Sequence, residues 1–146
     1  MKSIFTESTA VPSSRSMGEI TNLLMSAGAI AINQEIEEGK VVGLSFVIPY
    51  GAGRIPYRLP LRIEPVFKKL NGARKNFRMD AEVKDREQAE RIAWRQLFWW
   101  LKSQLALIDL GMVEAAEVLM PYRLGANGQT MFDSYKQKLI AAPDGG

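Results

Sequence analysis

Apolar residues recur along the chain at two different spacings, which predict an alternation of helices and strands. Helical spacing comes first, at Ile20, Leu23, Leu24 and Ala27. The preceding Ser16-Met17-Gly18-Glu19 has the form of a capping box, and Gly28 is a natural stop. We therefore expect a helix from about residue 17 to 27.

Three segments then alternate between apolar and polar residues, as strands do: 30–36, 41–48 and 54–62. In the second, one face is wholly apolar and belongs in the core: Val42, Leu44, Phe46 and Ile48. In the third, one face carries Ile55, Tyr57, Leu59 and Leu61, and the other carries Arg54, Pro56, Arg58, Pro60 and Arg62. Proline cannot donate a ladder hydrogen bond, so this strand is expected at the edge of an antiparallel sheet.

The second half of the chain is dominated by one long apolar pattern. A short helix is expected from Glu64 to about residue 70, then a basic loop over residues 73–84. Asp85 is positioned to cap a helix over residues 86–110, which Gly111 closes. Residues 113–120 fit a short helix or a strand, and a final helix over 130–140 is expected to dock through Met131, Phe132 and Tyr135.

These elements predict an α+β fold. It consists of a three-stranded antiparallel sheet with the long helix of the C-terminal half packed on one face, plus short N-terminal and C-terminal helices. Polar ends suggest a flexible N-terminal tail over residues 1–16, a single domain over 17–140 and a flexible C-terminal tail over 141–146.

Composition limits the chemistry of the chain. It has no cysteine and no histidine, which excludes disulfides, thiol nucleophiles, Cys-ligated metals and His-based catalytic arrangements. No apolar run approaches the roughly 20 residues of a membrane span, and the N-terminus lacks the pattern of a secretory signal, so we expect an intracellular protein. We expect no catalytic residue, cofactor or metal. Carboxylate and Mg²⁺ chemistry stays open, although Glu114 and Glu117 fit a solvated helix face better than a metal site.

Positive charge is concentrated in one segment. The whole chain has a net charge of +3, but residues 54–84 carry nine Lys and Arg against three Asp and Glu. The nine are Arg54, Arg58, Arg62, Lys68, Lys69, Arg74, Lys75, Arg78 and Lys84. Strand geometry places the first three in a row, and a row of guanidiniums beside a basic loop suits a phosphate backbone.

Aromatic residues near these cations favour single-stranded nucleic acid over duplex. Phe77 lies within the basic loop and Tyr50 in the preceding hairpin loop, where each could stack on an exposed base. There is a plainer interpretation of the same residues. Charges on an edge strand prevent sheets from aggregating, and loop aromatics often pack beneath their own loops.

The long helix carries an unusual density of aromatic side chains. Trp94, Phe98 and Trp99 fit a core, an oligomer or partner interface, or, with Trp100, an aromatic ligand pocket. We assign the first three to the candidate interface and leave the core interpretation open.

Several segments together resemble a family of small tailed-phage proteins of unassigned function. They are Ala89–Leu97, Gln104–Ile108 and Met120-Pro121-Tyr122 in the second half of the chain, and Gly43–Phe46 and Tyr57–Pro60 in the first. The resemblance implies a phage or prophage origin, action in the bacterial cytoplasm, and a gene from the replication and recombination region. The β-β-β-α order is also similar to that of single-strand annealing proteins.

Three hypotheses follow. The first is a phage-encoded, non-catalytic protein that binds or anneals single-stranded DNA and can assemble as a homo-oligomer. The second is a module that occupies a host or phage protein of replication or defence. The third is a carboxylate and Mg²⁺ enzyme, which the scattered acidic residues make the weakest.

Overall fold

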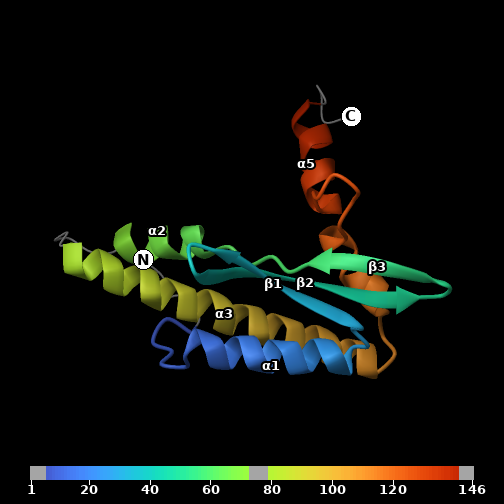
Figure 1. Ribbon diagram of the computed structural model, residues 1–146, viewed down its shortest axis with the longest axis horizontal. Coiled ribbons are helices and arrows are strands. Elements are labelled where there is room, and N and C mark those ends of the chain that lie inside the picture. The colour runs from blue at the N-terminus through green and yellow to red at the C-terminus, as the bar shows by residue number, and fades with distance from the viewer. Residues whose placement is uncertain (1–5, 73–78, 142–146) are drawn as a thin grey trace. The chain divides into compact units, whose positions relative to one another are not determined.

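The computed structural model describes residues 6–72 and 79–141 of the chain. It has a three-stranded antiparallel sheet, one long helix and several shorter helices, which confirms the expected α+β class (Figure 1). The chain forms two compact units: unit 1 is Met1–Leu23 with Leu61–Ser103, and unit 2 is Leu24–Pro60 with Gln104–Gly146. We expected the long helix to pack on the sheet, but most of this helix belongs to unit 1 and the sheet belongs to unit 2, so the packing stays a prediction. The expected single domain also stays a prediction.

Helix α1, Ser13–Ser26, begins earlier than its sequence pattern predicted. The amides of Arg15 and Ser16 donate to the carbonyl of Pro12, which starts the helix there. Ser16 is therefore buried inside the helix and does not form the expected capping box. The predicted end is confirmed, since Gly28 has a φ of +97° and its amide donates to the carbonyl of Met25.

Helix α3, Met79–Asp109, also begins earlier than expected. Asp85 was predicted to cap it, but Asp85 lies within the helix with only 3% of its surface exposed. The predicted loop over residues 73–84 is thus helical from Met79 onward, and residues 73–78 lie outside the described residues. Gly111, with a φ of +74°, follows the end of the helix as predicted.

Side-chain contacts within unit 1 join its segments. Helix α2, Ile63–Gly72, contacts α3 through Arg86, whose guanidinium lies 4.0 Å from the ring centre of Phe67 and donates to Glu64. The Gln88 amide donates to the carbonyls of Glu7 and Thr9, which fixes the segment before α1. Among the described residues of this unit, the buried apolar side chains are Ile20, Phe67, Ala89, Ile92, Ala93, Trp94, Leu97, Phe98 and Leu101.

Unit 2 contains the sheet, in the order β1-β2-β3, with β1 at Ala31–Glu37, β2 at Lys40–Tyr50 and β3 at Gly53–Arg58. The β1–β2 turn needs positive φ at both central residues, and Glu38 and Gly39 adopt 52° and 76°. Leu44, Phe46 and Ile48 are buried as predicted, whereas Val42, which the irregular β1–β2 register skips, is only half-buried. The edge position of β3 is confirmed, because β2 is its only neighbour among the strands described.

Strand β3 is shorter than the alternating pattern predicted. The amide of Leu59 still donates to the carbonyl of Leu44, but Pro60 has no amide proton to continue the ladder. Arg62 therefore lies beyond the strand, and the predicted row of three arginines is reduced to Arg54 and Arg58.

The free edge of β3 is partly covered by a C-terminal segment of the same unit. Tyr57 forms an isolated bridge with Arg123, and the Leu124 amide donates to the Pro56 carbonyl at 2.9 Å. The Tyr57 ring also stacks on Phe46, with ring centres 5.4 Å apart. Tyr57 is consequently 2% exposed.

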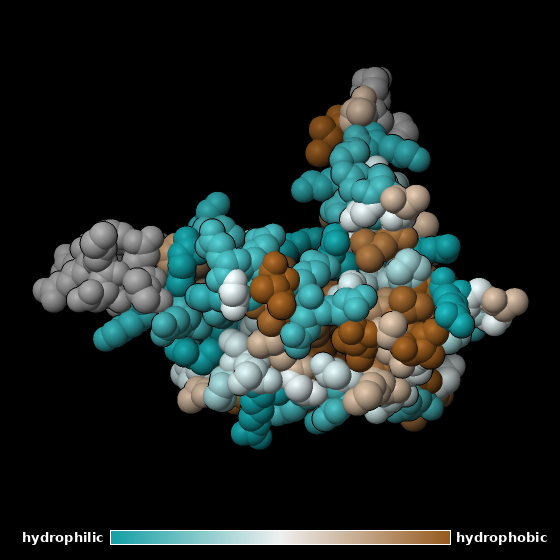
Figure 2. All heavy atoms as spheres, in the orientation of Figure 1, coloured by the Kyte–Doolittle hydropathy of each residue, from teal (hydrophilic) through white to brown (hydrophobic). Residues whose placement is uncertain are grey.

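The remaining helices of unit 2 are short. They are α4 at Ala115–Val118, the 3₁₀ helix η1 at Met120–Tyr122 and α5 at Met131–Ala141. We expected α5 to dock through Met131, Phe132 and Tyr135, but these are 46%, 38% and 58% exposed. Apolar atoms remain on the surface of α5 (Figure 2). The spacing predicted the helix correctly, but it does not reveal whether a surface exists to receive that face.

No helix in the described part of the chain has both the length and the apolar character needed to cross a membrane.

Tyr57 predicts a loss of stability at high pH. Burial raises the pKa of its hydroxyl above the ordinary 10.0, and the charge of Arg123 offsets part of that rise. The folded chain thus favours the neutral phenol, a contribution that is complete below pH 10.0 and is lost as pH rises through the folded-state value. Above pH 10.0, we therefore expect the free energy of unfolding to fall less with rising pH in Tyr57→Phe than in the wild type. Urea denaturation at several pH values measures this difference. Tyr135→Phe, at an exposed position of α5, is the control and should behave as the wild type.

Candidate functional site

The net positive charge of the chain comes from unit 1. Its sequence carries thirteen Lys and Arg against eight Asp and Glu, a net charge of +5. Unit 2 carries six against eight, a net charge of −2. We therefore expect a site for an anionic ligand in unit 1.

The structure separates the nine residues predicted to bind nucleic acid, which are the clustered cations other than Lys84 together with Phe77. Arg54 and Arg58 lie in β3 of unit 2, whereas Arg62, Lys68 and Lys69 belong to unit 1. The other four lie outside the described residues: Arg74, Lys75, Phe77 and Arg78.

Arg58 is engaged by its own unit. Its Nε donates to Glu35 at 2.7 Å, and its Nη1 donates to the carbonyl of Gly128 at 3.1 Å. The Glu35 carboxylate lies directly over Gly43, where a Cβ would come within 3.0 Å of Oε2. Because Gly43 has no side chain, an acid on β1 can reach across β2 to an arginine on β3. This ion pair makes Arg58 a poor candidate for contact with a ligand.

Three cations of the predicted set remain available in unit 1. Arg62, Lys68 and Lys69 are exposed, and no acidic side chain in the described residues forms an ion pair with them. Glu64, the nearest acid in sequence, is instead paired with Arg86. These three charges therefore face solvent.

The aromatic residues of the long helix differ in exposure. Trp94 and Phe98 are 1% and 7% exposed, so they belong to the core and not to the predicted interface. Trp99 is 43% exposed and remains a candidate for contact with a ligand or partner. The sequence could not distinguish them, because the apolar residues surround most of the helix.

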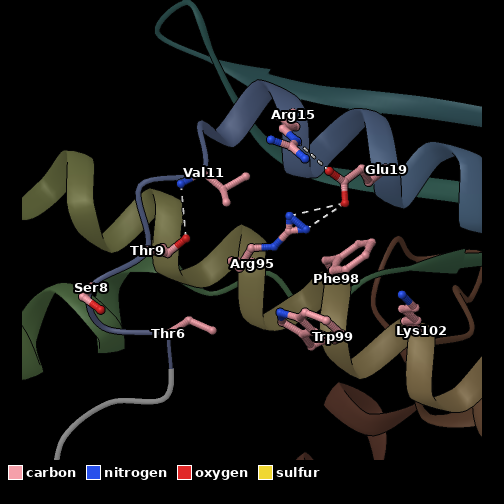
Figure 3. Close-up of a pocket in the computed structure, with 10 residues that line it drawn as sticks. All are labelled: Thr6, Ser8, Thr9, Val11, Arg15, Glu19, Arg95, Phe98, Trp99 and Lys102. Carbon is pink, nitrogen blue, oxygen red and sulfur yellow. Dashed lines mark hydrogen bonds and ion pairs between the residues drawn. The ribbon is translucent and has the colours of Figure 1, made fainter.

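A groove of about 470 Å³ lies beside Trp99 in unit 1 (Figure 3). The segment before α1 forms one wall, and α1 and α3 form the others. The side chains that line it combine hydroxyls, cations, one acid and two aromatic rings: Thr6, Ser8, Thr9, Val11, Arg15, Glu19, Arg95, Phe98, Trp99 and Lys102.

Arg95 is the buried charge of this groove. Only 6% of it is exposed, and its guanidinium lies 4.0 Å from the ring centre of Phe98. Nη2 donates to Glu19 at 2.8 Å, while the other oxygen of Glu19 accepts from Arg15 at 2.9 Å. Glu19 thus bridges two arginines.

Lys102 adds a further positive charge. Its ammonium lies 5.3 Å from the ring centre of Trp99 and 5.7 Å from that of Phe98, within cation–π range. With Arg15, Arg95 and Lys102 opposed by Glu19 alone, the charged residues lining the groove have a net formal charge of +2. The groove therefore favours an anionic group next to an exposed aromatic surface.

Glu114, Glu117 and Tyr50, which the sequence offered as further candidates, form hydrogen bonds with one another. Glu114 precedes α4, and its amide donates to the Glu117 carboxylate at 3.2 Å. The hydroxyl of Tyr50, which is 52% exposed, lies 3.4 Å from both carboxylate oxygens of Glu114. Within residues 6–72 and 79–141, no three acidic side chains gather into a metal-binding group.

Sequence reasoning missed Arg95, Arg15 and Lys102. A usable signal existed for Arg95, since it interrupts the apolar run from Ile92 to Leu101 and needs a partner if that run is buried. No comparable signal marks the other two, which come from different segments.

The Arg95–Glu19 pair predicts an uneven cost of removing acids. We expect Glu19→Ala to lower the free energy of unfolding by about 3 kcal/mol, because it leaves a buried guanidinium without its carboxylate. Glu64→Ala removes an exposed ion pair and should cost less than about 1 kcal/mol. Urea denaturation followed by circular dichroism measures both, and equal costs would contradict the structural role of Arg95.

The chain matches no family model, and no curated protein or solved structure shows significant similarity to it.

Proposed function

We propose that the chain is a phage-encoded, non-catalytic protein that binds single-stranded DNA, with unit 1 as the binding unit. The observation that carries this proposal is the net charge of +5 on unit 1 against −2 on unit 2. The resemblance of the sequence to tailed-phage proteins of the replication and recombination region supports the same proposal.

Exposed cations that form no ion pair with a described acidic side chain suit contact with phosphates. Arg62, Lys68 and Lys69 need no rearrangement of existing ion pairs to meet a polyanion. Each phosphate they neutralise releases condensed counterions, so binding should weaken as salt rises. The basic residues Arg74, Lys75 and Arg78, next in the sequence, would extend this contact.

A pair of charge-matched variants tests the assignment to unit 1. Lys68→Ala with Lys69→Ala removes two exposed lysines from α2, and Lys136→Ala with Lys138→Ala removes two exposed lysines from α5. Both double variants have the same net charge. We expect the first to weaken binding of a fluorescent single strand and to lower the salt slope by up to about 1.4, and the second to do neither. Fluorescence anisotropy at several salt concentrations provides the measurement.

Two results would count against the proposal. Affinity that does not depend on salt would exclude a phosphate-dominated contact. Equal losses in the two double variants would show that the total charge matters and that unit 1 has no special role. A duplex of the same sequence serves as the competitor, and tighter binding to the duplex would exclude a single-strand preference.

A second candidate function, binding to another protein, is favoured by α5. Its exposed apolar residues Met131, Phe132, Tyr135 and Leu139 fall on one side of the helix, at spacings of one, three and four residues. Such a face is a docking element for a partner helix or groove. The partner would be a host or phage protein or a second copy of the chain.

Self-association through α5 has a direct test. We expect Phe132→Ser with Tyr135→Ser to lower the mass measured by light scattering at high protein concentration, because polar residues then replace the apolar contact. Lys136→Ala with Lys138→Ala, on the same helix, is the control and should keep the mass of the wild type. A wild-type chain that stays monomeric at all concentrations would exclude a second copy as the partner.

A further inference from the structure

We propose that the groove beside Trp99 is a nucleotide subsite, in which a base of the single strand stacks on Trp99 and the adjoining phosphate contacts Lys102 and Arg15. This inference rests on the proposed function and adds to it a specific site that exposed surface charge alone would not create.

Trp99 has the properties of a stacking platform. It is 43% exposed, although its neighbour Phe98 is buried and lies edge-on to it with ring centres 5.3 Å apart. That edge contact holds the indole in place without covering it. A base has a π-face whatever its identity, so stacking here requires no particular sequence.

The cations of the groove are arranged to receive a phosphate. The Lys102 ammonium lies over the indole ring, 5.3 Å from its centre, and Figure 3 shows the two side chains beside one another. We therefore expect it to contact the phosphate that adjoins a base stacked on this ring. Arg15 is exposed over 70% of its side chain and is held by Glu19 through Nε, which leaves its terminal nitrogens free of described ion pairs. Arg95 is buried and fixed by Glu19, so it contributes positive potential more than direct contact.

Two buried polar atoms of the groove residues are compatible with a bound ligand. Among the described residues, four buried side-chain atoms are without a hydrogen-bond partner, and two of these, Thr6 Oγ1 and Arg95 Nε, belong to residues that line the groove. Buried polar atoms in native proteins are nearly always hydrogen-bonded, and exceptions often mark a missing ligand or water. Thr6 also has a φ of 65°, a backbone conformation rare for a β-branched residue.

The combination selects a nucleotide over a simple anion. An inorganic phosphate or a carboxylate would use the cations but not the exposed indole, and an apolar ligand would leave three cations and the hydroxyls unused. Hydroxyls of Ser8 and Thr9 on the opposite wall add groups that can bond to a sugar or phosphate oxygen. A nucleotide uses all three kinds of group.

The deciding experiment compares two single strands of about 15 nucleotides, one of oligothymidylate and one abasic, that share the same phosphate backbone. Anisotropy with the full chain should show tighter binding of oligothymidylate. Trp99→Ala should lower affinity for oligothymidylate about fivefold or more and remove its advantage over the abasic strand. Tyr135→Ala removes an aromatic residue of α5 that is more exposed than Trp99, at 58% against 43%, and should leave the advantage unchanged.

The outcomes separate the two proposals. If neither strand binds, the proposed function fails and the subsite fails with it. If both strands bind equally well with a steep salt dependence, the proposed function stands and the subsite is overturned. The groove would then bind a phosphate without its base, or a protein. If Trp99→Ala and Tyr135→Ala lower affinity equally, the subsite is likewise overturned.

A second measurement starts from the wild-type chain and uses a variant that keeps an aromatic ring at position 99. Stacking quenches indole fluorescence, so oligothymidylate should quench the wild-type chain and the abasic strand should not. Trp99→Phe should remove most of the quenching, because Trp94 is buried and Trp100, which is half-buried, does not line the groove. Quenching that persists unchanged in Trp99→Phe would overturn the assignment of the base to this ring.

Discussion

A positive charge held out of water is the constraint around which unit 1 is arranged. The guanidinium of Arg95 is nearly inaccessible, and leaving a charge in that position without its partner is strongly destabilising. Glu19 supplies the opposite charge from α1, and the ring of Phe98 lies against the guanidinium. The relation between α1 and α3 within this unit is therefore fixed by polar geometry as well as by apolar packing, and the groove follows from that relation.

The same arrangement explains why the groove is positive. Glu19 has one carboxylate and two arginine partners, so the pairing leaves a surplus of positive charge close to the indole of Trp99. Elsewhere in the chain, arginines such as Arg58 and Arg86 each face an acid. The difference between a cation that stabilises the fold and one that is available for a ligand thus depends on the acids around it.

The sequence predicted the elements better than their surroundings. The apolar alternation of β2 and the glycines after α1 and α3 were interpreted correctly, because strand period and positive φ are local properties. Tertiary relations were not predicted. Glu19 resembled a cap because its true partner, Arg95, is 76 residues away, and α5 resembled a docked helix because spacing does not encode the presence of a receiving surface.

The candidate site shows the same limit. Nothing in the sequence separates Trp94 from Trp99, which have the same side chain on one helix and opposite exposures. Arg58 was predicted to bind nucleic acid because apolar and basic residues alternate clearly along β3. Its ion pair with Glu35 depends on an acid of another strand, which that alternation does not reveal. The basic segment was identified from composition alone, and composition does not reveal how the folded chain divides that charge.

The glycine under the Glu35–Arg58 pair has a consequence for how this sequence can change over time. A side chain at position 43 would collide with the carboxylate of Glu35 only while that acid reaches across β2 to Arg58. Positions 35, 43 and 58 should therefore be coupled, so that the effect of a substitution at one depends on the residues at the other two. Related chains that lack the acid would be free to carry a larger residue at position 43, and the three positions would be expected to covary.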